Sequence, residues 1–263
     1  TNMYMNYIFQ KINYIFYIIS KYTKIVEKRY KVSFHYFSIF RLIYLQLEKG
    51  YTKNLFKNLE NYLIIGNYYL LEPKNKNNIN IISGGIGKDI TFDLDCLKRF
   101  DINKIVMIDP TQIAEDTTEQ IVNDKVIFIK KALYSEVKNI KIYYPHESVS
   151  DNSNLSIENL YSSKNFTTVK TTTINEITEK FLINQIDILK LDIEGVADSV
   201  IVNLIENNIM PDQICFELEK PVDVFNQFHF FKRIKNFLKT LSKHYEIYNY
   251  TSIKKGYRME LLA

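Results

Sequence analysis

The segment from Ile79 to Asp109 constrains the fold of this chain more than any other feature. It begins with an apolar β-branched run, passes through a turn with Gly84, Gly85 and Gly87 and a helix-like stretch, and ends with a second apolar run. Glycines remove the side chains that would keep a ligand away from the backbone of such a turn. A strand, a glycine turn, a helix and a strand that ends in an acid form a unit at which nucleotides and S-adenosylmethionine (SAM) bind.

The residues of this unit predict how a ligand would be held. We expect Gly84, Gly85 and Gly87 to border it, and the Asp109 carboxylate to accept hydrogen bonds from both hydroxyls of an adenosine ribose. Ile90 stands where a pyrophosphate-binding turn has Gly or Ala, which argues against NAD. Two structural interpretations stay open: the glycines could serve turn geometry alone, and Asp109 could be a helix cap or turn residue.

Strand and helix patterns alternate through the rest of the chain. This alternation and the closing antiparallel hairpin predict an α/β fold with a Rossmann-like seven-stranded sheet of the class I methyltransferase type, rather than six parallel strands. The patterns predict strands at 79–83, 104–109, 126–130, 137–144, 168–173, 186–192, 213–218, 245–250 and 257–262, and helices at 88–100, 111–123, 174–182, 196–207 and 225–244.

The first 75 residues have a different character. Apolar residues recur at spacings of three and four from Tyr4 to Leu71, which predicts three or four helices. The polar stretch Glu72–Asn78 then marks a boundary between a helical N-terminal extension, 1–75, and a catalytic domain, 76–263. The extension could pack on the catalytic domain, provide a surface for self-association, or make peripheral contact with a membrane.

A second informative segment ends the predicted strand at 186–192. Lys190, Asp192 and Glu194 alternate and therefore share a face, and in a parallel sheet this strand end lies next to the glycine turn. Glu217 and Glu219 alternate in the same way at the end of the next strand. Asp192 is the first candidate for contact with an acceptor or for a general base, and Glu217 is the second.

Other roles for these carboxylates stay open. They could bind a hard cation such as Mg²⁺, or they could pair with Lys190, Lys220 and Arg258. A structural ion pair accounts for a lysine inside an apolar strand about as well as a catalytic role does.

Composition excludes several classes of protein. The 34 basic and 30 acidic residues give a net charge of +4, too close to balance to indicate a nucleic-acid partner. No apolar stretch reaches the roughly 18 residues that a membrane span needs. Cys96 and Cys215 are far apart in the sequence and are expected to be buried and unpaired, so we expect a cytoplasmic protein.

Taken together, these residues resemble the FkbM family of SAM-dependent methyltransferases. The resemblance implies that Gly84, Gly85, Gly87 and Asp109 hold SAM, that the Lys190–Gly195 segment borders the cleft, and that the reaction is O-methylation of sugars or polyketide-like hydroxyls. It covers roughly residues 79–220 and rests, in order, on the stretches SGGIGKDITFDLD, VMIDPT, DNSNLS, TTTINEI, ILKLDIEG and QICFELEK.

The chain also departs from that family at two positions. Ser83 stands where many members have an acid, so contact with the methionine amino group of SAM is expected to be made differently. Glu219 stands where many members have a histidine, which puts the usual general base in doubt.

We therefore expect a SAM-dependent O-methyltransferase acting on a hydroxyl of a saccharide or small-molecule acceptor, in surface-glycan (polysaccharide) biosynthesis. A NAD-dependent oxidoreductase and a non-catalytic Rossmann-like binding module are the alternatives. The expected site has Asp192, Lys190 and Glu217 as catalytic residues, no metal ion, and a cofactor-binding set of Ser83, Gly84, Gly85, Gly87, Asp109, Ala132 and Asp192.

Overall fold

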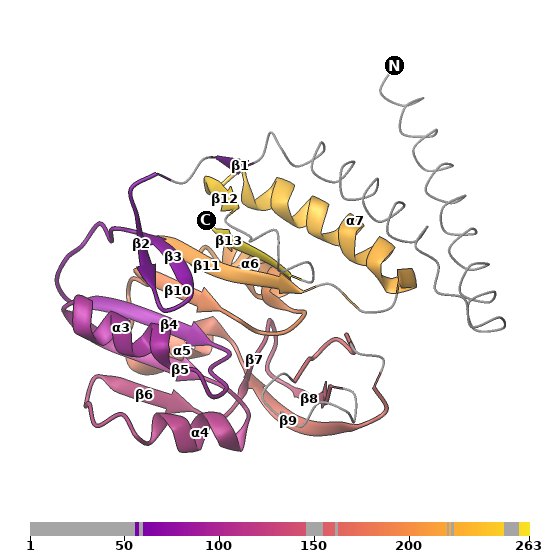
Figure 1. Ribbon diagram of the computed structural model, residues 1–263, viewed down its shortest axis with the longest axis horizontal. Coiled ribbons are helices and arrows are strands. Elements are labelled where there is room, and N and C mark those ends of the chain that lie inside the picture. Colours follow the sequence, from indigo (N-terminus) through magenta and orange to yellow (C-terminus); the bar gives the residue numbers. More distant parts are fainter. Residues whose placement is uncertain are drawn as a thin grey trace.

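The fold is built on one large twisted sheet. The structure is a computed structural model that describes residues 56–57, 60–145, 155–160, 163–219, 221, 224–249 and 258–263. Within these residues the main sheet has eight strands in the order β1-β12-β13-β11-β10-β4-β5-β6 (Figure 1). They are β1 (Phe56–Lys57), β4 (Ile79–Gly84), β5 (Ile102–Ile108), β6 (Val126–Ile129), β10 (Ile188–Leu191), β11 (Gln213–Glu219), β12 (Ile247–Asn249) and β13 (Arg258–Leu262).

The strand directions confirm the predicted class of fold. β13 runs antiparallel to both of its neighbours, β11 and β12, while the other pairs are parallel. Without the two-residue edge strand β1, this is the predicted seven-stranded Rossmann-like sheet. Its chain order reverses between β4 and β10, which is where open α/β sheets bind ligands.

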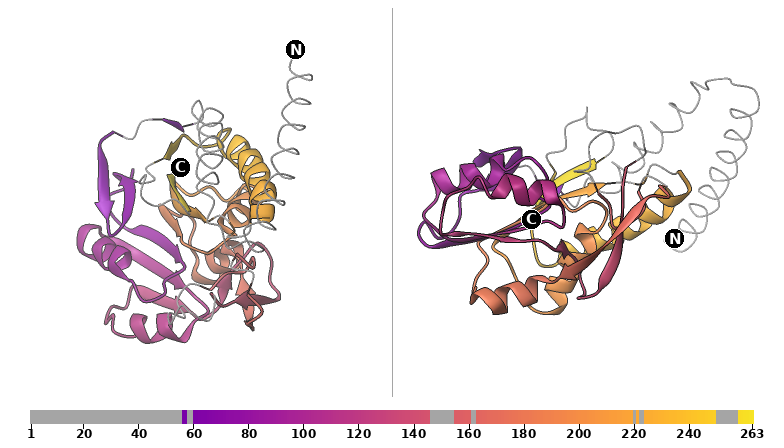
Figure 2. Two further views of the ribbon diagram at one scale, coloured as in Figure 1. Left: turned by 45° about the vertical axis from the view of Figure 1, so that its right-hand side comes forward. Right: turned by 90° about the horizontal axis from the view of Figure 1, so that it is seen from below.

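Helices cover both faces of this sheet. The strands are apolar on both sides, as expected of parallel strands between two layers, and successive residues of one strand enter different cores. Ile82 packs with α5, α6 and α7, whereas Ile81 packs with α3 and α4. The two sets of helices lie on opposite sides of the sheet (Figure 2). They are α3 (Thr91–Arg99), α4 (Gln112–Thr118), α5 (Ile174–Phe181), α6 (Ala197–Glu206) and α7 (Val224–Leu241).

Two predicted strands belong to a separate small sheet. β8 (Asn139–Tyr143) and β9 (Phe166–Thr172) pair with each other antiparallel, and the short β7 (Ala132–Leu133) pairs parallel with β9. This three-stranded sheet stands beside the carboxyl ends of the main strands (Figure 1). The segments at 137–144 and 168–173 are therefore strands as predicted, but they belong to this small sheet and not to the main sheet.

The prediction of helices up to Leu71 is wrong over its last part. β2 (Tyr62–Ile65) and β3 (Tyr68–Leu71) form an antiparallel hairpin, with Ile65 paired to Tyr68. Gly66 has φ +55°, which suits a two-residue Gly-Asn turn between two runs rich in aromatic and β-branched residues. This turn predicts a hairpin, and it outweighs the irregular three- and four-residue spacing of apolar residues that had indicated a helix. The other predicted helices, with the proposed membrane contact and self-association, fall on residues 1–55, outside the described part of the chain.

The hairpin packs directly on the main sheet. The Gln213 side chain accepts a hydrogen bond from the Leu71 amide at 3.0 Å and donates one to the Leu71 carbonyl at 3.1 Å. A Cβ at Gly66 would lie 2.8 Å from the Phe92 nitrogen, so only glycine permits this approach to α3. The Tyr68 ring meets Phe92 edge-on, with 5.4 Å between ring centres. The boundary at residue 75 remains a prediction, and the hairpin before it contributes to the layer that covers the sheet.

Two further findings concern the cysteines and the helices. Cys96 and Cys215 are buried free thiols, as predicted. Across the described ranges, none of the helices combines the length and the apolar character needed to cross a bilayer.

The Gln213 contact gives a test of hairpin docking. Gln213→Ala should lower the free energy of unfolding by about 1–2 kcal/mol, because it leaves both backbone groups of Leu71 without their partners. Urea denaturation measures this change. Gln120→Ala, at an exposed position, should change it by less than about 0.5 kcal/mol, and equal effects of the two variants would contradict the account.

Candidate functional site

A cavity of about 380 Å³ opens at the carboxyl ends of β4, β5 and β10. Its walls include the Gly85–Gly87 turn, the Asp109–Thr111 segment, the turn after β10 with Asp192, and Tyr68 of the hairpin. The size falls in the range of small-molecule sites, and the position is where the order of the parallel strands reverses.

The glycine turn depends on its glycines for geometry. Gly85 has φ +76° and Gly87 has φ +54°, a region that residues with a side chain rarely adopt. A Cβ at Gly85 would lie 1.8 Å from the Asp192 carbonyl oxygen. The Asp192 amide in turn donates to the Gly84 carbonyl at 2.9 Å. The glycine turn is thus packed against the segment that carries Asp192, the first candidate for acceptor contact or general base.

Asp109 holds this turn in place. Its Oδ2 accepts hydrogen bonds from the amides of Ile86 at 2.9 Å and Gly87 at 3.0 Å. Its Oδ1 accepts from the amide of Thr111 at 2.8 Å and from its hydroxyl at 2.5 Å. Four hydrogen bonds fill the acceptor positions of one carboxylate. Asp109 is therefore a turn residue, as one open interpretation had it, and ribose hydroxyls could bind it only by replacing one of these bonds.

The Lys190 side chain contacts the same turn. The side chain is 3% exposed, its ammonium group donates to the Gly85 carbonyl, and it lies 5.4 Å from the centre of the Tyr68 ring. Among the described residues no carboxylate lies within ion-pair distance of it. The structural ion pair that the sequence left open is not observed, because Lys190 contacts the backbone of the turn. A catalytic role for Lys190 remains a prediction.

Asp93 is a buried acid that the sequence analysis missed. It lies in the first turn of α3, is 1% exposed, and makes no hydrogen bond of ordinary geometry to the described residues. Burial raises the pKa of Asp93 from 3.8 to about 6, against the opposing effects of Lys190 and the Ser83 hydroxyl. Its position one residue after Phe92 and three before Cys96, both buried, is the sequence signal that could have revealed it.

Tyr68 was also missed, because its segment was expected to be helical. Its hydroxyl donates to Asp192 Oδ2 at 2.8 Å and approaches Glu217 Oε1 at 3.4 Å. Burial, and then the charges of Asp192 and Glu217, raise the pKa of Tyr68 well above its ordinary value. The phenol therefore remains a hydrogen-bond donor at neutral pH and links the two predicted candidates for acceptor contact.

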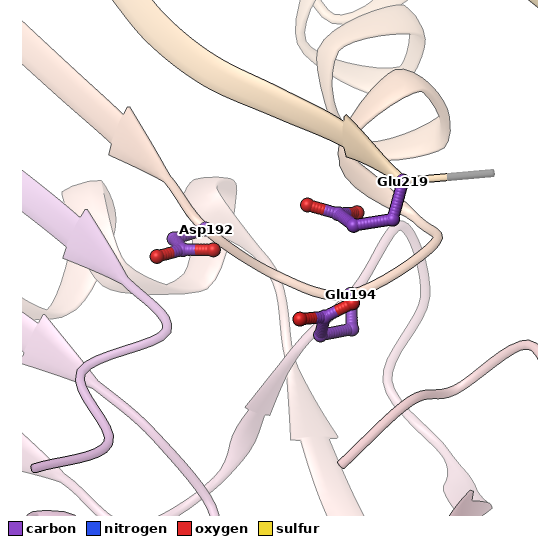
Figure 3. Close-up of side chains that lie close together, drawn as sticks. All are labelled: Asp192, Glu194 and Glu219. Carbon is purple, nitrogen blue, oxygen red and sulfur yellow. The ribbon is translucent and has the colours of Figure 1, made fainter. Parts of the chain in front are cut away.

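Three carboxylates meet beside this pair. Asp192, Glu194 and Glu219 each have an oxygen within 4.8 Å of the others (Figure 3). Glu219 Oε2 accepts from the Gly195 amide at 3.0 Å, while Oε1 has no hydrogen-bond partner in the described part of the chain. Burial first, and then Glu194, Asp192 and Glu217, raise the pKa of Glu219 well above its usual range. The convergence of carboxylates predicted from the two strand ends is confirmed.

Residues 155–160 lie against the same region. The Ser156 hydroxyl donates to the Glu158 carbonyl, and its oxygen lies 3.2 Å from the Glu194 carbonyl oxygen. Arg233 of α7 pairs with Glu158 and, through Nε, with Asp198 at 2.8 Å. Residues 155 and 157 line the cavity, so this segment contributes to its wall.

Most of the predicted site residues border the cavity. Ser83 and Gly84 do not line the cavity. Ser83 is fully buried near Asp93, so its side chain is not exposed to a cofactor in the cavity. The predicted residues that line the cavity are Gly85, Gly87, Asp109, Ala132, Lys190, Asp192 and Glu217.

Comparison with known proteins gives only structural likeness. No protein-family model matches the chain, and no curated protein sequence matches it either. Among solved structures, the chain is similar to methyltransferase FkbM from Methylobacillus flagellatus, with 11% identity and a TM-score of 0.44 over 70% of this chain and 43% of that one. It is thus matched to less than half of that protein's length.

Two further solved structures are similar to part of this chain at the same low level. One is precorrin-6y C5,15-methyltransferase from Geobacter metallireducens, with 7% identity and a TM-score of 0.37 over 72% of this chain and 80% of that one. The other is spermidine synthase from Thermotoga maritima, with 12% identity and a TM-score of 0.36 over 73% of this chain and 54% of that one. Likeness at this level decides nothing about the reaction.

The buried Asp93 predicts a pH dependence of stability. Because its pKa in the folded state exceeds that of the unfolded chain, the folded state binds this proton more tightly, and stability falls as pH rises from about 4 to about 6. Asp93→Asn should remove this fall and be more stable than the parent chain above pH 6, by up to about 3 kcal/mol.

Urea denaturation between pH 4 and 8 measures the difference. Asp124→Asn, at an exposed position, controls for the loss of one carboxylate. A difference between Asp93→Asn and the parent chain that is the same at every pH would contradict the raised pKa.

Proposed function

We propose that this protein is a SAM-dependent O-methyltransferase of the FkbM type. One observation carries the proposal: a single cavity joins a glycine turn, fixed by the acid at the end of the second strand of its βαβ unit, to two carboxylates at the ends of the next strands. Methyl transfer needs both halves, a donor site and an acceptor site that share one space.

The donor half fits an adenosine-containing cofactor. The backbone of Gly85–Gly87 and the Asp109 carboxylate would face the ribose, and the apolar Ala132 and Leu133 offer surface to an adenine ring. When bound, SAM supplies an electrophilic methyl group. The chain's own part is to hold the turn rigid, through Asp109 from one side and Lys190 from the other.

The acceptor half would be formed by Asp192, Glu217 and Tyr68. A hydroxyl placed beside Asp192 could give up its proton to the carboxylate as the oxygen attacks. The Tyr68 hydrogen bond fixes the orientation of Asp192, and this orientation matters because most of the rate of such a transfer comes from alignment. A saccharide or small-molecule acceptor and a role in surface-glycan biosynthesis rest on the ordered motifs of the sequence alone. A cytoplasmic location rests on the two cysteines expected to be buried and unpaired.

Ligand binding tests the cofactor directly. Calorimetry with the full chain should show micromolar binding of SAM and S-adenosylhomocysteine (SAH) and none of NAD, because Ile90 occupies the position where a dinucleotide turn needs a small residue. Binding of NAD would favour an oxidoreductase. If none of the three ligands binds, a non-catalytic module would be favoured.

A substitution at Asp109 tests the geometry of the donor half. Asp109→Ala should weaken SAH binding by about 1–3 kcal/mol and also lower the melting temperature without ligand, because the turn loses the acceptor of its amides. Asp116→Ala, an exposed aspartate on α4, should leave SAH affinity unchanged. Equal SAH affinity of Asp109→Ala and the parent chain would exclude this turn from the binding site.

A further inference from the structure

We propose that Asp192, Glu194 and Glu219 form a binding site for a hard divalent cation of the Mg²⁺ class at the wall of the cavity. The existence of this site does not depend on the proposed methyl transfer, although a role for the cation in binding an acceptor oxygen would rest on it.

The fold brings the three carboxylates together from two adjacent strand ends. Asp192 and Glu194 lie in the turn after β10, and Glu219 is the last residue of β11, which pairs with β10 in parallel (Figure 3). Oxygens bound directly to one cation are at most about 5 Å apart around Ca²⁺ and about 4 Å apart around Mg²⁺. The oxygens of the three carboxylates lie within 4.8 Å of one another, so they meet the larger limit without any movement of the side chains.

Glu219 gives the second, separate indication. Only 8% of the residue is exposed, and its Oε1 accepts no hydrogen bond from any described residue. Its carboxyl group extends from β11 toward Asp192 (Figure 3). A buried charged oxygen without a donor is unfavourable by several kcal/mol unless a cation or a proton balances it. A cation bound at this position would therefore give Glu219 Oε1 the partner that it lacks among the described residues.

Two described cationic side chains of this region already have other partners. Lys190 donates to the Gly85 carbonyl, and Arg233 pairs with Glu158 and Asp198. One rival remains from the strand register: Arg258 of β13 stands opposite Glu219 of β11. Neutralisation by Arg258 is the competing arrangement, and the experiment has to distinguish it from a bound ion.

The donor set also selects the kind of ion. All three groups are carboxylates, and hard oxygen ligands suit Mg²⁺, Mn²⁺ and Ca²⁺ rather than Zn²⁺, which is usually bound with histidine or cysteine. Asp192 and Glu194 also line the cavity, so an ion held by them would be reachable by an oxygen of a ligand there.

Titration with Mn²⁺ tests the site. The full chain, first treated with a chelator, is titrated while free Mn²⁺ is followed by electron paramagnetic resonance, with Mg²⁺ and Ca²⁺ as competitors. One saturable site is expected. Glu219→Gln should weaken Mn²⁺ binding at least about tenfold, as expected for a lost direct ligand, while Glu119→Gln, the same change at an exposed position, should not.

Each outcome decides the question. No saturable binding by the parent chain up to about 1 mM Mn²⁺, or equal binding by Glu219→Gln, overturns the proposal. Binding that occurs only in Arg258→Gln would assign the neutralising role to Arg258 and overturn it as well. If Glu219→Gln does not fold, Glu194→Gln in the partly exposed turn replaces it. SAH affinity, measured in the same samples, shows separately whether the methyl-donor proposal holds.

Discussion

The carboxylate of Asp109 is the interaction on which the rest of the site depends. Its hydrogen bonds to the Ile86 and Gly87 amides fasten the glycine turn to the end of β5, and its bonds to Thr111 fix the start of α4. Hydrogen bonds that involve an ionised group are roughly twice as strong as neutral ones, so this side chain sets the shape of the turn. The turn that Asp109 fastens forms part of the cavity wall.

The same region carries groups that do not serve stability. Asp93 is buried without a hydrogen bond of ordinary geometry to the described residues, and Lys190 is buried with a backbone carbonyl as its partner. Burial of such groups costs free energy that apolar residues would not cost. Buried ionisable groups of this kind are frequent at functional sites, and these two lie near the glycine turn.

The sequence predicted the fold well because parallel strands and their helices leave strong periodic patterns. The strands around β4 and β10 are short apolar runs between turns, and the helices between them show clear amphipathic spacing. The hairpin β2–β3 was missed because apolar residues at every position of a short segment fit both periods, and the Gly66-Asn67 turn was not weighed. The separate sheet of β7, β8 and β9 depends on tertiary pairing that no local pattern encodes.

The sequence predicted which residues lie at the site better than it predicted which groups those residues contact. Spacing along two strands was enough to expect Asp192 near Glu217, because the ends of adjacent parallel strands meet. The partner of Asp109 was not predictable, since a carboxylate at a strand end can bind a ligand or a neighbouring backbone equally well. Tyr68 and Asp93 reach the site from other elements, and their burial follows from packing that only the folded chain shows.

A crystal structure of the full chain with SAH tests the central claim most directly. The account predicts adenosine against the Gly85–Gly87 turn, a ribose hydroxyl within hydrogen-bond distance of Asp109, and the sulfur directed toward Asp192. Adenosine bound elsewhere, with the four hydrogen bonds of Asp109 intact and no contact to the turn, would contradict it.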